Sequence, residues 1–252
     1  MKLALRLALV LLGTVSVPLA AATELTPHRA EYKVRISVVS GQLNTELKVT
    51  DEGYVATHVV KPTGLSRVVT NGEIFVTSTF APVADGVRPI RYRAINTIKD
   101  EPEANIEFDW SAHVATGTVG SVPVELPLDG PSHDAVSIQY ELMLDLLNKQ
   151  PSESYVLFDV EKMRAAQIRQ VGSSTVKTGA GQFEVVGIQH QKEGSSRITT
   201  MWCAPELDYL PVVIEQHRDG KLRFRATLSS YVPLTTPDQK PAATTTRPRR
   251  VY

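Results

Sequence analysis

Three aspartates, Asp109, Asp134 and Asp208, are the residues best placed to do chemistry in this chain. Each lies at the end of an expected strand or helix and has apolar neighbours. A pair of carboxylates brought within about 5 to 10 Å can hydrolyse a glycosidic bond. Aspartate at such positions more often caps a helix, as expected for Asp134, or braces a turn. We therefore predict no catalytic residue, and keep a carboxylate-dependent polysaccharide hydrolase as an alternative.

Cysteine and histidine form no reactive or metal-binding pattern. Cys203 is the single cysteine, so no intramolecular disulfide can form. No His or Asn lies near it in sequence to activate it, which favours a small buried hydrophobe over a nucleophile. The histidines are scattered without ligand spacing: His28, His58, His113, His133, His190 and His217. Because glycine-rich phosphate loops and nucleophile elbows are also missing, we expect no metal and no cofactor.

Large apolar side chains are the remaining candidates for a binding site. A curved sheet with one helix can leave its interior incompletely filled, and incompletely filled barrels hold ligands. The residues predicted to line such a cavity are Tyr32, Phe108, Trp110, Tyr140, Met143 and Trp202. The same side chains are equally compatible with an ordinary packed core.

Alternation of apolar and polar residues predicts strands through most of the chain. From His28 to Ser40, the side chains expected to face the core are Ala30, Tyr32, Val34, Ile36 and Val38. From Arg197 to Glu215, two alternating segments flank a turn with prolines at both ends, which predicts a β-hairpin. Trp202 and Cys203 are expected on opposite faces of its first strand.

Glycines punctuate these strands. Gly41-Gln42 is expected to turn the first strand into the second. Asn71-Gly72 predicts a tight hairpin between strands at residues 68–69 and 74–76. Gly172 is expected to separate short strands at residues 167–171 and 174–178. The chain therefore reads as a meander of short antiparallel strands.

One clear helix interrupts the meander, from about residue 134 to 147. Its two adjacent apolar lines are Val136, Tyr140, Met143 and Leu147, and Ile138, Leu142 and Leu146. A helix this apolar needs cover on a wide face, so we place it against the concave side of the sheet. The predicted fold is mainly β: a strongly curved antiparallel meander or open β-barrel packed on one α-helix.

The two ends of the chain differ from its body. Lys2 and Arg6 precede an apolar run from Leu7 to Leu19 that is too short to span a bilayer, which predicts a signal peptide over residues 1–22 and export to the periplasm. Residues 23–232 are expected to form one β-rich domain, and the Thr/Pro-rich basic segment 233–252 a disordered tail. Residues 23–232 carry 21 basic and 26 acidic groups, which argues against nucleic acid as a partner.

Three passages together resemble a known family. They are Phe108-Asp109-Trp110 at a strand end, Asp134-Ala135-Val136-Ser137 at the helix start, and Trp202-Cys203-Ala204-Pro205 leading to Asp208-Tyr209-Leu210-Pro211-Val212. The chain resembles the Gram-negative exported proteins of domain of unknown function family 3108 (DUF3108) from about Pro27 to Tyr231. The resemblance implies a periplasmic β-rich domain with no assigned activity, so it transfers no catalytic residue.

The sequence thus predicts a non-enzymatic periplasmic protein that binds an apolar or amphipathic component of the cell envelope, such as a lipid, a lipoprotein or a glycolipid. The main alternative is a structural or protein-interaction module that uses an edge strand as its contact surface. The basic tail is a possible contact to the membrane or cell wall. The oligomeric state does not follow from the sequence.

Overall fold

The computed structural model describes residues 24–36, 39–84, 86–149, 152–159, 162–192 and 194–234. The predicted signal peptide and residues 235–252 of the predicted tail lie outside the described residues. No helix in the described ranges is both long and apolar enough to span a membrane.

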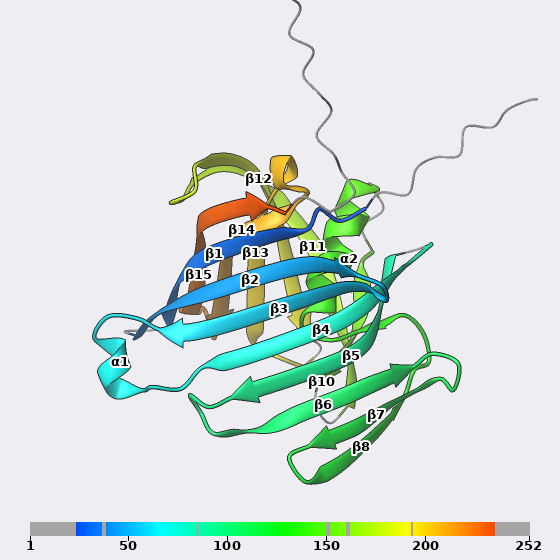
Figure 1. Cartoon of the computed structure of the whole chain (residues 1–252). Coiled ribbons are helices and arrows are strands. Elements are labelled where there is room, and N and C mark those ends of the chain that lie inside the picture. Colours follow the sequence, from blue (N-terminus) through cyan, green and yellow to red (C-terminus); the bar gives the residue numbers. More distant parts are fainter. Residues whose placement is uncertain are drawn as a thin grey trace, which may run out of the picture.

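The described residues form one fifteen-stranded sheet with two α-helices and a short 3-10 helix (Figure 1). The strands are β1 (His28–Ile36), β2 (Val39–Thr50), β3 (Gly53–Pro62), β4 (Ile74–Val83), β5 (Gly86–Asn96), β6 (Glu101–Asp109), β7 (Val114–Val119), β8 (Val122–Pro127), β9 (Ser132–His133), β10 (Ser154–Asp159), β11 (Lys162–Lys177), β12 (Gln182–Lys192), β13 (Arg197–Ala204), β14 (Leu210–Arg218) and β15 (Lys221–Pro233). The helices are α1 (Ser66–Val69), α2 (Ser137–Leu147) and the 3-10 helix η1 (Pro205–Leu207).

The first and last strands pair in the middle of the sheet. The spatial order is β8-β7-β6-β5-β4-β3-β2-β1-β15-β14-β13-β12-β11-β10-β9. β1 runs antiparallel to β15, with His28 opposite Pro233 and Ile36 opposite Phe224. The sheet curls, so that β1–β8 lie in front of β10–β14, with α2 towards one side (Figure 1). This arrangement confirms the predicted mainly β, strongly curved antiparallel fold, although β9 pairs with β10 in parallel.

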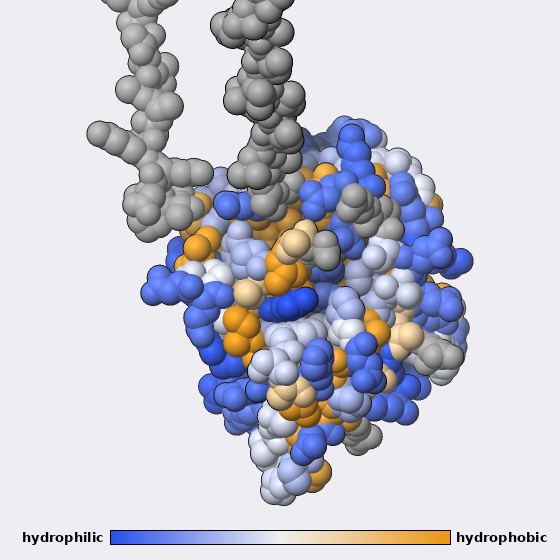
Figure 2. Space-filling view, turned by 90° about the vertical axis from the view of Figure 1, so that its right-hand side faces the viewer, coloured by the Kyte–Doolittle hydropathy of each residue, from blue (hydrophilic) through white to orange (hydrophobic). Residues whose placement is uncertain are grey.

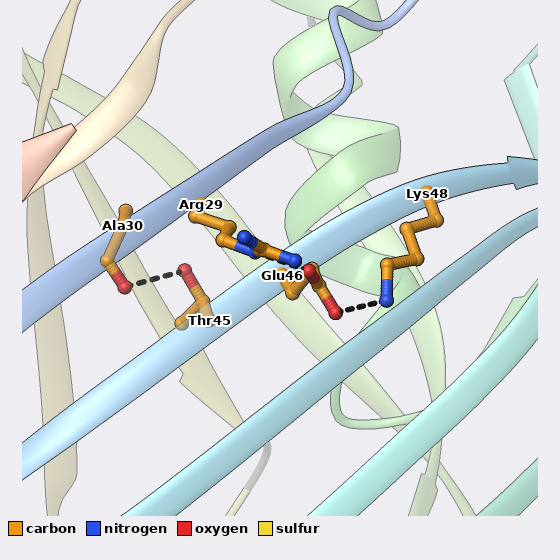
Figure 3. Close-up of polar contacts among 5 residues, drawn as sticks. All are labelled: Arg29, Ala30, Thr45, Glu46 and Lys48. Carbon is orange, nitrogen blue, oxygen red and sulfur yellow. Dashed lines mark hydrogen bonds and ion pairs between the residues drawn. The ribbon is translucent and has the colours of Figure 1, made fainter. Parts of the chain in front are cut away.

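Neighbouring residues of β1 and β2 show how the sheet separates its two faces (Figure 3). Arg29 is opposite Glu46 and forms an ion pair with it, while Lys48 binds the other carboxylate oxygen at 2.5 Å. One residue further, Thr45 donates a hydrogen bond to the Ala30 carbonyl at 3.4 Å, and both residues are buried. Alternate residues therefore face solvent and the core, as the period of a strand requires.

The helix α2 is held against β4 and β5. Tyr140 stacks on Phe80 of β4 with ring centroids 5.1 Å apart. The Glu141 carboxylate accepts a hydrogen bond of 2.6 Å from the Val87 backbone N–H, at the start of β5. A side chain at Gly86 would collide with this carboxylate, since a Cβ there would lie 2.2 Å from a Glu141 oxygen. The observed helix falls within the predicted range of about 134 to 147.

The hairpin of β11 and β12 extends beyond β13, since residues 182–185 of β12 pair with β11 but not with β13, and its turn reaches β15. The N–H of Gly179, in the turn that joins them, donates to the Leu228 carbonyl at 3.1 Å. The prediction of two short strands separated by Gly172 is wrong: β11 is continuous, and Gly172 lies at an irregularity in its pairing with β12. One extra residue in a strand bends it without ending it.

Two predicted turns are also wrong. Residues 68–69 belong to helix α1, and Asn71-Gly72 lies in the loop between α1 and β4. Only glycine fits at position 72, because the Thr97 backbone lies so close that a Cβ would be 2.5 Å from its carbonyl oxygen. Gly41-Gln42 is part of β2, paired with both β1 and β3, so it cannot be a turn. Local glycine signals do not report these long-range pairings.

Candidate functional site

The helix α2 covers only part of the concave face of the sheet. Its contacts with Phe80 and Val87 lie at the late end of β4 and the early end of β5. Antiparallel strands bring these two ends together, at the same side of the sheet. The opposite ends of β4 and β5, near Ile74 and Asn96, therefore lie away from the helix.

Residues on the inner face of the sheet are buried near α2 and partly exposed away from it. On β3, Tyr54 and Ala56 are buried, whereas His58 and Val60 in the same alternating series are partly exposed. Partly exposed apolar side chains that pack on the main core continue along this face: Val60, Val76, Ala94, Ile214 and Phe224. We call these five residues together with His58 the inner mouth. It is an apolar concave surface that α2 leaves partly open.

His58 in the inner mouth, and two fully buried residues nearer α2, carry polar atoms without partners. Among the described residues, His28 Nε2, His58 Nε2 and the Tyr140 hydroxyl are buried and have no hydrogen-bond partner. The His28 ring lies between Tyr140 and Tyr231, with centroid distances of 6.4 and 5.4 Å. Buried polar groups are rarely left unpaired, so these atoms are suited to hydrogen-bond a water molecule or a polar group of a ligand.

Both imidazoles in this region are neutral at pH 7. Burial and, to a smaller extent, the nearby His28 lower the pKa of His58 to about 4. Burial also lowers the pKa of His28, against the opposing effects of the Thr26 carbonyl and Asp208. Because His28 Nδ1 donates to the Thr26 carbonyl at 2.8 Å, its Nε2 is a hydrogen-bond acceptor. The site therefore offers hydrogen bonds without positive charge.

The six residues predicted to line a cavity all belong to the main core cluster or pack against it. Tyr32, Phe108, Tyr140 and Met143 are buried in the main core cluster, while Trp110 and Trp202 are partly exposed at its margin. The Trp110 indole N–H donates to the Pro89 carbonyl at 2.7 Å. Trp202 lies over Gly187, where a Cβ would be only 2.8 Å from the indole ring. Tyr140 alone among the six supplies an unpaired buried polar atom.

The three candidate aspartates each accept hydrogen bonds within the fold. Asp134 Oδ1 accepts hydrogen bonds from the backbone N–H groups of Val136 and Ser137, which caps the start of α2. Asp109 accepts bonds from Ser111 and Ala112 in the turn after β6. Asp208 has left-handed backbone geometry after η1 and accepts a bond from the Thr26 hydroxyl. The contacts of Asp134 and Asp109 agree with the predicted capping and turn roles, whereas Asp208 binds a residue far away in the sequence.

Cys203 is a buried hydrophobe. It lies in a second core cluster with Met201, whereas Trp202 packs against the main cluster, so the two faces of β13 are as predicted. Burial raises the pKa of its thiol to about 12, which keeps the sulfur protonated. In the part of the chain that the structure describes, no three His, Cys, Asp or Glu side chains come together to hold a metal ion.

Sequence reasoning missed His28 and His58 because it looked for local ligand spacing. A usable signal was present in the strand period. His28 shares the alternating series of Ala30 and Tyr32, and His58 shares that of Tyr54 and Ala56. β1 and β3 are separated only by β2, so inward-facing residues of these two strands lie near one another. Two inward-facing histidines on them are therefore candidates for a common interior site.

Comparison with known proteins identifies a structure with a similar fold and the family to which the chain belongs. No curated protein matches the chain in sequence. A β-barrel-like protein of domain of unknown function DUF1849 from Brucella abortus has a similar structure, with a TM-score of 0.58 and 14% identity over 85% of this chain and 100% of that chain. A "putative lipoprotein" of Parabacteroides distasonis aligns with a TM-score of 0.31 and 10% identity over 83% of this chain and 100% of that one. The family described as "Protein of unknown function (DUF3108)" matches residues 29–227, most of the chain. This protein is therefore a member of the DUF3108 family.

Proposed function

We propose that this protein is exported to the periplasm and binds, in the inner mouth, the apolar part of an amphipathic cell-envelope molecule such as a lipid, a lipoprotein acyl chain or a glycolipid. The observation that carries the proposal is the partial exposure of inward-facing apolar side chains where α2 ends its cover. Burying apolar ligand surface against them contributes about 0.8 kcal/mol per methylene group.

The unpaired polar atoms favour an amphipathic ligand over a purely apolar one. His28 Nε2, His58 Nε2 and the Tyr140 hydroxyl can hydrogen-bond a hydroxyl, ester or amide group. Because the two imidazoles are neutral, these atoms do not select for an anionic group in the interior. A ligand with a short neutral polar section next to an acyl chain fits both features.

The two alternatives have less support. A protein-interaction module that adds a strand to an edge needs an accessible edge, yet β8 contains two prolines and β9 has only two residues. A hydrolase needs carboxylates free to act on substrate, whereas Asp109, Asp134 and Asp208 are occupied by turn or cap contacts.

Native mass spectrometry of the protein purified from its own periplasm, followed by organic extraction, tests the proposal. We expect a co-purifying lipid in near-stoichiometric amount. Val60→Trp fills the inner mouth, while Val59→Trp places the same side chain at the adjacent position, on the outer face of β3. We expect the first variant to lose the bound lipid and the second to retain it.

Thermal unfolding of both variants shows whether the fold is retained. If Val60→Trp does not fold, Ala94→Leu is a smaller intrusion into the same surface and replaces it. A wild-type protein that carries no lipid, or equal lipid content in the Val60 and Val59 variants, contradicts the proposal and shifts support to the interaction module.

A further inference from the structure

The helix α1 presents two apolar side chains to solvent. Leu65 is 88% exposed and Val68 is 86% exposed. In Figure 1, α1 projects from one end of the sheet, between β3 and β4. Single exposed aliphatic residues are common on protein surfaces, but two side chains exposed to this extent on one projecting turn are a feature of contact surfaces.

Hydrogen bonds fix this turn to the sheet. The Ser66 hydroxyl accepts a bond of 2.9 Å from the Ser40 backbone N–H, and Ser66 itself is buried. The Thr63 N–H donates to the Ser40 carbonyl at 3.0 Å. The Arg67 Nε donates to the Pro62 carbonyl at 3.3 Å. The turn is therefore anchored through polar contacts, while Leu65 and Val68 stay outside the core.

Further apolar residues lie at the same end of the sheet. Ser40, which holds α1, is opposite Arg35 in β1, and the next residue, Ile36, is 43% exposed. Ile36 is opposite Phe224, and Leu222, two residues before it in β15, is 47% exposed. We call Leu65, Val68, Ile36 and Leu222 the apolar tip.

Positive charge surrounds the apolar tip. Four exposed basic side chains have no ion pair within the described ranges: Arg35, Arg67, Lys221 and Arg223. Two acidic groups of this end have basic neighbours, since Glu73 pairs with Lys61 at 2.9 Å and Asp219 with Arg218 at 3.9 Å. The tip thus combines apolar side chains with an excess of cations, whereas the domain as a whole is acidic.

A hollow of about 800 Å³ lies beside the tip on the outer face of β15, β1 and β2. Its wall includes three cations, Lys33, Arg35 and Arg225, and one acid, Glu31. Arg35 and Arg225 are direct cross-strand partners, and like charges in this position destabilise a sheet. Arg225 binds Glu215 at 3.2 Å, but Lys33 and Arg35 have no such acidic partner in the described part of the chain. An anionic group in the hollow would offset this repulsion.

We propose that the α1 end of this protein docks on an anionic lipid bilayer, with Leu65 and Val68 entering the interface and lipid phosphates contacting Arg35, Arg67 and the hollow beside them. Apolar side chains and basic residues together are the combination that binds peripheral proteins to such surfaces. The inner mouth opens at this same end, because Val60 lies two residues from the end of β3 and the loop carrying α1 follows. The docking surface does not depend on a ligand in the mouth.

Vesicle co-sedimentation of the full exported chain tests the proposal. The probes are vesicles of phosphatidylcholine alone and of phosphatidylcholine with phosphatidylglycerol. We expect binding to the anionic vesicles that weakens as salt is added. Leu65→Ser with Val68→Ser should weaken binding about 10- to 100-fold, since two aliphatic side chains no longer enter the interface. Arg35→Gln with Arg67→Gln should weaken it about fivefold per residue and reduce its salt dependence.

Val49→Ser is the matched control, because Val49 is a 49% exposed aliphatic residue near the end of β2, at the end of the sheet opposite α1. It should leave vesicle binding unchanged. Equal binding by wild type and the Leu65/Val68 variant overturns the proposal. So does loss of binding only when Arg247, Arg249 and Arg250 of the tail are changed to Gln. Self-association that Leu65→Ser abolishes in the absence of vesicles would instead make the tip a contact between copies of this chain. Vesicle binding and lipid content are separate readouts, so failure here leaves the inner mouth proposal to its own test.

Discussion

At the scale of single residues, histidines with a buried, unpaired ring nitrogen couple stability to pH. Burial lowers the pKa of His58, His133 and His190 to about 4, from 6.5. The unfolded chain therefore takes up protons at these positions below about pH 6.5, while the folded chain does not do so until about pH 4. Their contribution to stability is present above pH 6.5 and is lost as the pH falls towards 4.

We expect the free energy of unfolding to decrease in this window by about 1.4 kcal/mol per pH unit for each histidine. His58→Gln removes one titrating group, so its stability should depend less steeply on pH between 6.5 and 4. Urea denaturation at several pH values measures the slope. His113→Asn changes an exposed histidine with left-handed backbone geometry, which Asn tolerates, and should keep the wild-type slope. A His58→Gln slope equal to that of wild type would show that the folded protein does not keep His58 neutral in this pH range.

At the scale of elements, Asp134 joins the start of α2 to the sheet. Its Oδ1 caps the helix, and its Oδ2 accepts a hydrogen bond of 2.6 Å from the Ser78 hydroxyl of β4. Burial raises the pKa of this carboxyl, while the hydrogen bonds from Ser78, Ser137 and Val136 oppose the increase. One side chain thus sets where the helix begins and which strand it faces.

Asp134→Ala should lower the free energy of unfolding by about 2 to 4 kcal/mol, because it removes a cap and leaves the Ser78 hydroxyl without its acceptor. Chemical denaturation measures the loss. Asp129→Ala, at an exposed position in the preceding turn, should change stability by less than about 0.5 kcal/mol. Similar stability of the two variants would mean that the cap does not hold α2 in place.

At the scale of the whole molecule, an open sheet must protect its two ends. β8 at one end contains Pro123 and Pro127, which have no N–H to offer another strand. β9 at the other end has two residues, Ser132 and His133, both buried. Short strands and edge prolines are the devices that prevent strands of separate molecules from pairing.

Pro123→Val with Pro127→Val should therefore promote self-association, since it restores two backbone donors and raises the β-propensity of an edge strand. Size-exclusion chromatography with light scattering measures the increase in dimers and larger species. Thr118→Val adds a β-branched apolar residue to β7, which is paired on both sides, and should leave the mass unchanged. A double proline variant that remains the same size as wild type would show that some other feature protects this edge.

Local pattern in the sequence was enough to predict the mainly β class, the helix near residues 134–147 and the faces of Trp202 and Cys203. These features depend on periods of two and 3.6 residues, which are properties of neighbouring residues. The capping role of Asp134 follows from the same local geometry. Residue type was enough to predict that Cys203 is a small buried hydrophobe, since no activating residue lies near it in sequence.

Tertiary structure alone decided which strands pair and what stays uncovered. Residues 28 and 233 become partners in the middle of the sheet, and a period of two says which face a residue takes but not which strand lies beside it. The loop at Asn71-Gly72 and the continuous β11 depend on such pairings. The positions of α2 and α1 in the fold determine which surfaces stay uncovered. The inner mouth and the group formed by His28, His58 and Tyr140 depend on α2, and the exposure of Leu65 and Val68 depends on α1. Burial is set by the elements that cover a surface, and those elements are brought together only by the folded chain.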